Sequence, residues 1–210
     1  SDFGVVGNEE ITSTSTGRAY GLEFLYQQKL IKGFYAILAY TLVNSEFKNT
    51  TDDYIPTAWD SKHIVSLTGG KRFKKGWEIG FRWLFSGGSP YTPYDIATSS
   101  IKQNWDINGL GLLDYSQLNT QRESNFHQLN IRLDKKLFLK KFSLNFYLDI
   151  QNAYGYQAKL APVLLVETDE NGAPVEDPND PSRYSTKLID NASGIIQPTI
   201  GIIIEFKAKK

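Results

Sequence analysis

The segment 77–87 carries a large apolar residue at every second position from Trp77 to Phe85. Successive side chains of a β-strand point to opposite faces, so a period of two gathers the apolar set on one face. That set is Trp77, Ile79, Phe81, Trp83 and Phe85. The other face carries Glu78 and Arg82. Both a half-buried soluble strand and a membrane-spanning strand show such a pattern, and length and repetition distinguish them.

The same alternation recurs along the chain and predicts seven strands. They cover about 17–30, 34–47, 61–73, 77–87, 126–138, 142–154 and 195–206. A strand of about 10 residues crosses a bilayer when tilted, whereas strands of globular proteins average about 5–6 residues. In 34–47 both faces are mixed. There we assign four residues to the apolar face: Phe34, Leu38, Tyr40 and Leu42.

Charged residues avoid the predicted apolar faces. Six of them fall on the opposite face: Glu23, Glu78, Arg82, Arg132, Asp134 and Asp149. An Arg or Lys that faces the middle of a bilayer costs about 2–4 kcal/mol, which explains such an exclusion. No apolar run approaches the ~20 residues of a membrane-spanning helix. The predicted fold class is all-β, an antiparallel transmembrane β-barrel whose polar-face ions pair across strands.

Short and long connections take turns between these strands. The short ones are 31–33, 74–76 and 139–141, and the long ones are 48–59, 88–125 and 155–194. Outer-membrane barrels place short turns in the periplasm and long loops outside, so residues 1–16 are predicted as a further extracellular loop. Basic residues gather at the short connections and the C-terminal tail, where they can meet lipid phosphates. The alternative is that tight turns simply favour solvated charges.

An odd number of strands makes a complete barrel improbable. Single-chain bacterial barrels have even strand numbers, and residues 1–16 contain only a brief apolar stretch at 3–6. The chain also has no Met and no signal peptide. We therefore expect the C-terminal part of a larger barrel, whose two edges need the rest of that barrel. The alternative is a small standalone outer-membrane barrel with an anchoring or adhesion role.

The chain from about Thr16 on resembles a known family, and two segments are the most specific part of that resemblance. SGGSPYTPYD, at 86–95, and DIQNAYG, at 149–155, resemble the last strands of TonB-dependent outer-membrane receptors of the Bacteroidetes type, including SusC-like ones. The resemblance implies a barrel of about 22 strands closed by a separate plug, which is absent from this chain. It implies nutrient import driven by TonB through the plug, and a possible surface lipoprotein partner. It also implies that Phe206 is the terminal aromatic of the barrel-assembly signal, although the family ends there and this chain continues with Lys-Ala-Lys-Lys.

The connection 88–125 is the predicted ligand-binding segment. Its candidate residues are Tyr91, Tyr94, Trp105, Asp106 and Tyr115. Aromatic faces stack on sugar rings or flat ligands, and carboxylates accept bonds from hydroxyl groups. The sequence favours the plainer alternative, in which these aromatics pack the loop on itself or form an interfacial girdle.

Other chemistry finds little support. The acidic segment 166–184 carries carboxylate oxygens, which Ca²⁺ prefers as ligands, but their spacing is not that of an EF-hand. A solvated acidic loop is therefore favoured over a calcium site. Within it, Asn171–Gly172 predicts a two-residue type I′ turn. With no Cys and only His63 and His127, we predict no metal site, no cofactor and no enzyme activity. A barrel hydrolase remains the alternative, with these histidines as its only bases. The lysine clusters lack interleaved aromatics, so no nucleic-acid partner is predicted.

Overall fold

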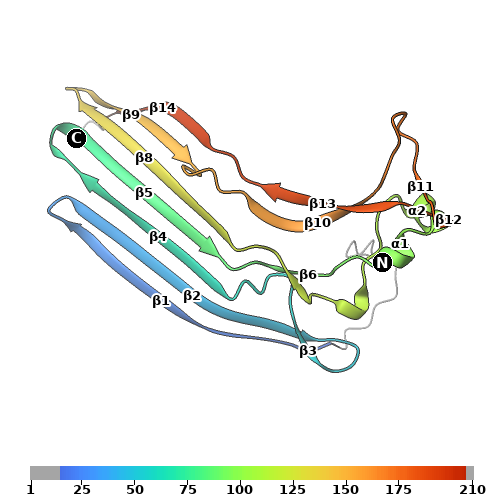
Figure 1. Ribbon diagram of the computed structural model, residues 1–210. Helices are drawn as coiled ribbons and strands as arrows, with labels where there is room; N and C mark the ends of the chain where they lie inside the picture. Colours follow the sequence, from blue (N-terminus) through green and yellow to red (C-terminus); the bar gives the residue numbers. More distant parts are fainter. Residues whose placement is uncertain (1–14, 207–210) are drawn as a thin grey trace.

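The computed structural model describes residues 15–206. Their largest element is an open antiparallel sheet (Figure 1). Its strands follow the order β1-β2-β4-β5-β8-β9-β14. They are β1 (Gly17–Ile31), β2 (Phe34–Lys48), β4 (His63–Arg72), β5 (Trp77–Ser86), β8 (Phe126–Phe138), β9 (Phe142–Gln151) and β14 (Gln197–Phe206). These bounds lie within about three residues of the ranges expected from the alternation. The chain is all-β and antiparallel, as predicted.

The register of the sheet aligns the apolar residues of all strands on one face. One row across it runs through Tyr26, Leu38, Leu67, Trp83 and Leu129, each opposite the next. This row includes Leu38, so the assignment of the even-numbered residues of β2 to the apolar face is correct. We call this surface the apolar face.

The neighbouring row lies on the other side of the sheet. It runs through Ile37, Thr68, Arg82 and Asn130. Because paired residues of adjacent strands share a face, this side collects the polar and charged residues of the alternation. We call this surface the polar face.

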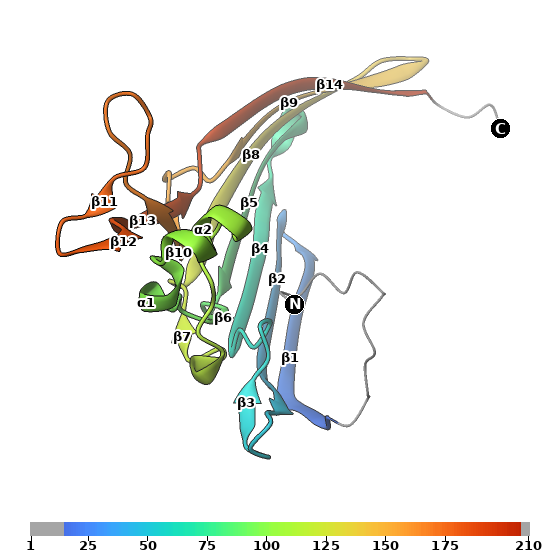
Figure 2. The same cartoon turned by 90° about the vertical axis from the view of Figure 1, so that its right-hand side faces the viewer.

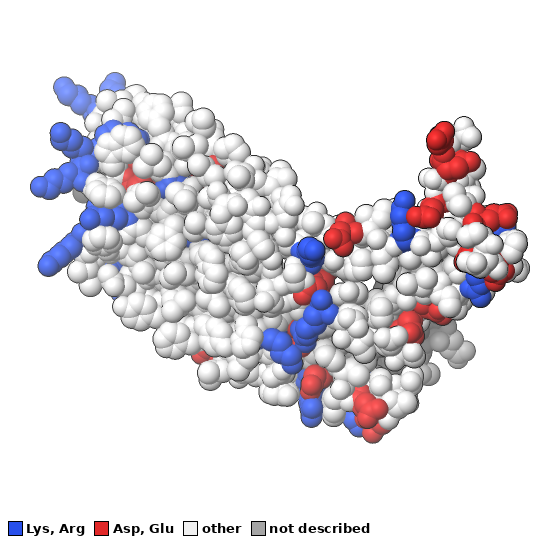
Figure 3. All heavy atoms as spheres, in the orientation of Figure 1, with Lys and Arg blue, Asp and Glu red and all other residues white. Residues whose placement is uncertain are grey.

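The sheet buries almost no hydrophobic core. Among the described residues only Ala158 and Leu164 are buried hydrophobic side chains, and both lie outside the sheet. On the apolar face Phe24 remains 52% exposed, and Ile200 remains 82% exposed. Figure 3 shows a broad uncharged region between a basic end and an end rich in acidic residues. An apolar surface of this extent marks an interaction site rather than a water-exposed face.

The short turns all lie at one end of the sheet, where the chain reverses tightly (Figure 1). Between β1 and β2 the two turn residues Lys32 and Gly33 have φ values of 50° and 86°. Positive φ at both positions is the type I′ geometry that matches the twist of paired strands. The turn between β4 and β5 contains the 3₁₀ turn η1 (Lys74–Gly76).

The long connections are folded, which the strand pattern did not predict. They contain β3 (Tyr54–Pro56), β6 (Pro90–Tyr91), α1 (Ile96–Ser99), α2 (Lys102–Asn108), η2 (Tyr115–Gln117), β7 (Gln121–Arg122), β10 (Ala158–Val166), β11 (Glu176–Asp177), β12 (Asp180–Tyr184) and β13 (Thr186–Ser193). Strands β10 and β13 pair antiparallel as a separate two-stranded sheet. Figure 2 shows α1, α2 and β10 to β13 to one side of the curved sheet, whereas β3 lies at its end and pairs with β2. Within residues 15–206, no helix is long and apolar enough to span a membrane.

The turn at Asn171–Gly172 differs from the predicted type I′ turn. Of these two residues only Gly172 has a positive φ, at 81°. The Gly172 N–H donates to the Asp169 carbonyl at 3.0 Å, and the Asp169 side chain accepts from the N–H groups of Asn171 and Ala173 at 2.9 Å. The side chain of Asp169 therefore organises a longer turn, because Asp readily bonds to the backbone two residues on.

The edge strands β1 and β14 each pair on one side only within residues 15–206. The sheet in this part of the chain is therefore open. The predicted extracellular loop at 1–16 falls almost wholly outside the described residues, as does the basic tail after Phe206.

Candidate functional site

A buried carboxylate organises the long-loop end of the sheet. Asp60, between β3 and β4, is completely buried, and its Oδ2 lies 2.5 Å from Nη2 of Arg122 in β7. Nη1 of Arg122 donates to the Asp60 carbonyl at 2.6 Å. The Ser45 N–H donates to Oδ1 of Asp60 at 2.8 Å, and Nζ of Lys62 lies 3.3 Å from Oδ2. This cluster attaches the loop between β5 and β8 to strands β2 and β4.

The contacts of Asp60 keep its carboxyl group ionised. Burial alone raises the pKa of Asp60, but the hydrogen bonds from Ser45, Arg122 and Lys62 outweigh it and hold that pKa below its ordinary value. A buried charge is tolerated only when it is paired and hydrogen-bonded, and here both conditions hold. Sequence reasoning missed Asp60, because nothing in its local pattern indicates a partner 62 positions away.

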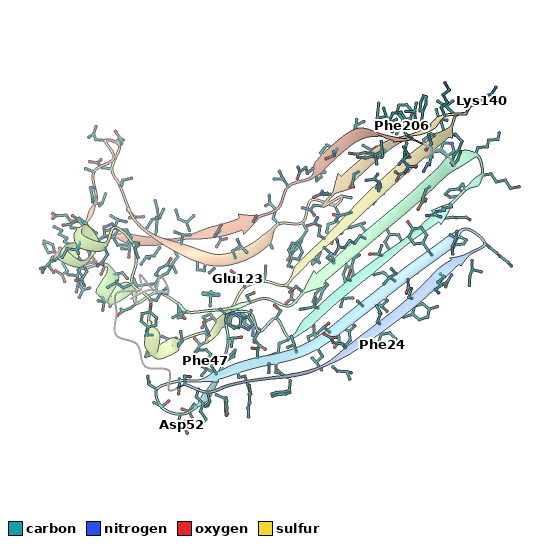
Figure 4. All side chains as sticks on the ribbon, turned by 180° about the vertical axis from the view of Figure 1, so that it is seen from behind. Phe24, Phe47, Asp52, Glu123, Lys140 and Phe206 are labelled. Carbon is teal, nitrogen blue, oxygen red and sulfur yellow. The ribbon has the colours of Figure 1, made fainter. Side chains whose placement is uncertain are left out.

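A groove of about 1180 Å³ lies at the same end, between the β2–β3 connection and the η2 region. Phe47 lines it and belongs to the polar face by its register opposite Gly17. Figure 4 shows Phe47 and Asp52 at this end of the sheet. Ile55, Leu118 and Lys48 also line the groove. Hydroxyl, amide and carboxylate groups line much of the remainder: Ser15, Thr16, Asn49, Thr50, Thr51, Asp52, Ser116 and Thr120. Such a lining suits a hydroxyl-rich ligand, which both donates and accepts hydrogen bonds.

The structure places only one of the five predicted ligand residues in this groove. Tyr115 lines it, at the start of η2. Tyr94 instead packs inside the loop: a Cβ at Gly111 would lie 2.7 Å from its ring and 2.9 Å from the side chain of Leu164. Tyr91 lies in β6, opposite Gln121 of β7. Tyr94 therefore occupies the packing position that the sequence alternative described.

Trp105 and Asp106 lie on α2, away from the groove. The Tyr184 hydroxyl donates to Oδ1 of Asp106 at 3.0 Å, and this bond raises the pKa of Tyr184. Nη1 of Arg183 donates to Oγ of Ser100 at 2.9 Å. The loops at 88–125 and 155–194 are therefore joined by side chains of α2 and β12 and by Ser100, which follows α1. That any of the five candidates binds a ligand stays a prediction.

Three carboxylates of the acidic segment accept hydrogen bonds from backbone N–H groups of their own turns: Asp169, Asp177 and Asp180. Oδ1 of Asp180 accepts from the Ser182 N–H, and its Oδ2 accepts from Nε of Arg183, both at 3.0 Å. The bonds from Ser182 and Arg183 lower the pKa of Asp180. Glu176 pairs with Lys102. In residues 15–206 no three His, Asp or Glu side chains are arranged to hold a metal ion.

Both histidines lie on the apolar face near the long loops, each beside tyrosines. Nδ1 of His63 lies 3.0 Å from the Tyr40 hydroxyl, and Nδ1 of His127 lies 2.7 Å from the Tyr154 hydroxyl. The His127 ring stacks on Tyr156 with 3.6 Å between centroids. Strand β5 separates β4 from β8, so the two histidines do not form one site. Amphipathic rings gathered at one end of an apolar surface are typical of an interfacial aromatic girdle.

The polar face carries networks of paired ions. Arg132 lies 2.9 Å from Asp134 and 3.7 Å from Asp149, and its guanidinium lies 4.1 Å from the centre of the Tyr147 ring. The structure thus places these predicted polar-face charges together as structural pairs.

A second network lies at the short-turn end of the polar face. Glu78 accepts from the Tyr35 hydroxyl and from Nε of Arg72, both at 2.9 Å. Glu23 and Arg82 have no ion-pair partner in the described part of the chain. Arg82 lines a groove of about 340 Å³.

Comparisons with known proteins assign no relatives to this chain: no protein-family model matches it, and no match was found among curated proteins.

Proposed function

We propose that this chain forms part of the wall of a transmembrane β-barrel in the outer membrane of a Gram-negative bacterium, within a TonB-dependent receptor that imports a nutrient. The observation that carries the proposal is the contrast between the two faces of one sheet. One face is apolar and exposed across seven strands, and the other holds paired ions.

The apolar face is energetically suited to lipid. Burying one Leu, Ile or Phe side chain gains about 1.5–3 kcal/mol, so leaving a whole face of them in water is very costly. Ile200, Ile202 and Ile204 of β14 are 82%, 59% and 54% exposed. Lipid covers such a face without requiring a second protein layer. The paired ions of the polar face then lie in an aqueous lumen, as in known outer-membrane barrels.

The two ends of the sheet support an orientation. The short turns carry lysines, and the long loops carry most of the acidic residues (Figure 3). Outer-membrane barrels turn tightly in the periplasm, which assigns the lysine end to the inner leaflet and the groove beside Tyr115 to the cell surface. In this orientation the groove is accessible to a nutrient such as a glycan, and a surface lipoprotein partner would lie on the same side.

The open sheet supports a larger barrel. Seven strands in an antiparallel sheet make β1 and β14 run in the same direction, so they cannot join each other as an antiparallel pair. Unpaired backbone groups at both edges are not tolerated in hydrocarbon. We propose that further strands close the barrel and that a plug fills its lumen, where Glu23 and Arg82 are available to contact it. Phe206, on the apolar face opposite Phe142, is the proposed assembly signal.

Fractionation and external proteolysis of the full-length gene product test this proposal. The protein should float with the outer membrane, and protease added to intact cells should cleave within 155–194 but not at the lysine-rich short turns. Deleting its gene and deleting TonB should abolish growth on the same member of a glycan panel. A soluble cytoplasmic protein would refute the membrane assignment, and growth that is independent of TonB would refute the transport assignment.

A further inference from the structure

A groove of about 800 Å³ lies on the apolar face near the short turns. Phe34, Ile79 and Phe81 form its sides. Its floor is low at Ala36 of β2, which has a small side chain, while the ring of Phe81 lies over the neighbouring Gly69 of β4. The surface is therefore apolar and hollowed, which is the shape that a hydrocarbon chain fills well.

Two lysines lie at the short-turn end of this groove. Lys71 lies on the apolar face between Phe34 and Ile79 in the register, and its Nζ is 4.2 Å from the centre of the Phe34 ring and 5.2 Å from that of Phe73. Lys32, in the β1–β2 turn, also lines the groove. Neither lysine forms an ion pair within residues 15–206. Their positive charges are therefore available to an anionic group.

A third lysine extends the charge along the same end of the apolar face. Lys135 lies opposite Trp77, with its Nζ 4.8 Å from the centre of the indole ring, and it donates to the Lys75 carbonyl at 2.7 Å. Lysine stems lie along apolar surfaces while the ammonium groups reach the polar boundary. The apolar face thus ends in a row of ammonium groups at the depth where lipid phosphates begin.

We infer that this groove binds an anionic phospholipid, with one acyl chain over Ala36 and against the ring of Phe81, and with the phosphate held by Lys71 and Lys32. The inference rests on the proposed function, because only a lipid-facing surface presents this groove to a phospholipid. Charge complementarity selects the headgroup: unpaired ammonium groups attract a net negative lipid and do not favour the cationic end of a zwitterionic one.

Lipid titrations followed by native mass spectrometry test the headgroup. The full-length protein, purified in detergent from the outer-membrane fraction, is titrated with phosphatidylglycerol and with phosphatidylcholine of the same acyl chains. Phosphatidylglycerol should bind more tightly, and Lys71→Gln should weaken it about fivefold and weaken phosphatidylcholine less, because the choline cation already offsets the charge of its phosphate. Lys140→Gln, in the β8–β9 turn outside the groove, is the matched control and should change neither affinity. Equal affinities for both lipids, or equal losses in both variants, would overturn the inference.

Two further measurements test the acyl chain. Ala36→Leu fills the groove and should weaken both lipids while every lysine remains. Free glycerol 3-phosphate should fail to displace bound phosphatidylglycerol at equal concentration, and displacement would show that the headgroup alone binds. Because every titration uses protein recovered from the outer membrane, loss of lipid preference refutes this site alone. Protein that never reaches that membrane refutes the proposed function instead.

Discussion

Asp60 and Arg122 are 62 positions apart in the chain, yet Oδ2 of the buried Asp60 lies 2.5 Å from Nη2 of Arg122. Arg122 also donates to the carbonyl groups of Asp60 and Gly88. One guanidinium therefore joins the start of β4, the end of β5 and the β6–β7 pair. This contact holds the loop at 88–125 beside the groove that Tyr115 lines.

Asp60→Asn should loosen this loop. The amide keeps an acceptor for the Ser45 N–H but loses the charge that pairs with Arg122, and we expect a local loss of about 2 kcal/mol. One third of the Arg122 side chain is exposed, so water offsets part of the cost. Hydrogen exchange within 88–125 in the full-length protein should accelerate by more than tenfold. Asp106→Asn, on α2, is the control and should leave exchange near β6 and β7 unchanged.

The same contact predicts a pH dependence. The pKa of Asp60 in the folded protein lies below its ordinary value of about 3.9. Its stabilising contribution is therefore complete above about pH 4 and is lost as the pH falls through the folded pKa. Proteolysis of the loop with an acid-active protease should rise below pH 4 in the wild type. In Asp60→Asn the rise should be smaller, and identical pH profiles would contradict an ionised Asp60.

Adjacent residues of β4 distinguish the two faces of the sheet. Leu67→Arg places a charge on the apolar face and should cost about 2–4 kcal/mol if that face meets lipid. Ser66→Arg places the same charge on the polar face and should be tolerated. The readout is the fraction of full-length protein that reaches the outer membrane as heat-modifiable, folded barrel. Equal yields of both variants would argue against a lipid-facing surface.

Substitution by alanine should cost different amounts of stability at two glycines near α2. Gly111→Ala puts a Cβ 2.7 Å from the Tyr94 ring and 2.9 Å from Leu164, so overpacking should cost about 1–3 kcal/mol. Gly109 has φ 67° and open space around it, so Gly109→Ala should cost only the backbone strain, about 1 kcal/mol. Loop stability is measured by protease susceptibility of the full-length protein.

A second substitution separates packing from strain. Leu164 is buried, so Leu164→Ala is itself destabilising, and the comparison is between backgrounds. Gly111→Ala should cost less in the Leu164→Ala background than in the wild type, because one of the atoms that the new methyl group meets is gone. Gly109→Ala should cost the same in both backgrounds, and an equal cost of Gly111→Ala in both would show that Leu164 does not pack on Gly111.

Sequence reasoning located the sheet strands because each strand carries its own signal. The alternation of Trp77 to Phe85 is local, and a strand with one apolar and one polar face must show it. It missed β10 and β13, whose pairing joins Ala158 to Ser193 across a long connection and leaves only a weak alternation. It also did not anticipate that Tyr94 packs within its loop while Tyr115 lines the groove, because exposure in a loop depends on contacts with distant elements.

By itself, the sequence determined the seven strands that run the length of the main sheet, which of their residues share a face and which end of the sheet is basic, because these properties follow from a period of two and from the order of the chain. Only the tertiary structure decided how the long loops fold, that Asp60 meets Arg122, and that Ala36 lies at the floor of a groove in the apolar face. Those features depend on which strands become neighbours and in which register. Such non-local choices are settled by the packing and hydrogen bonding of the whole sheet.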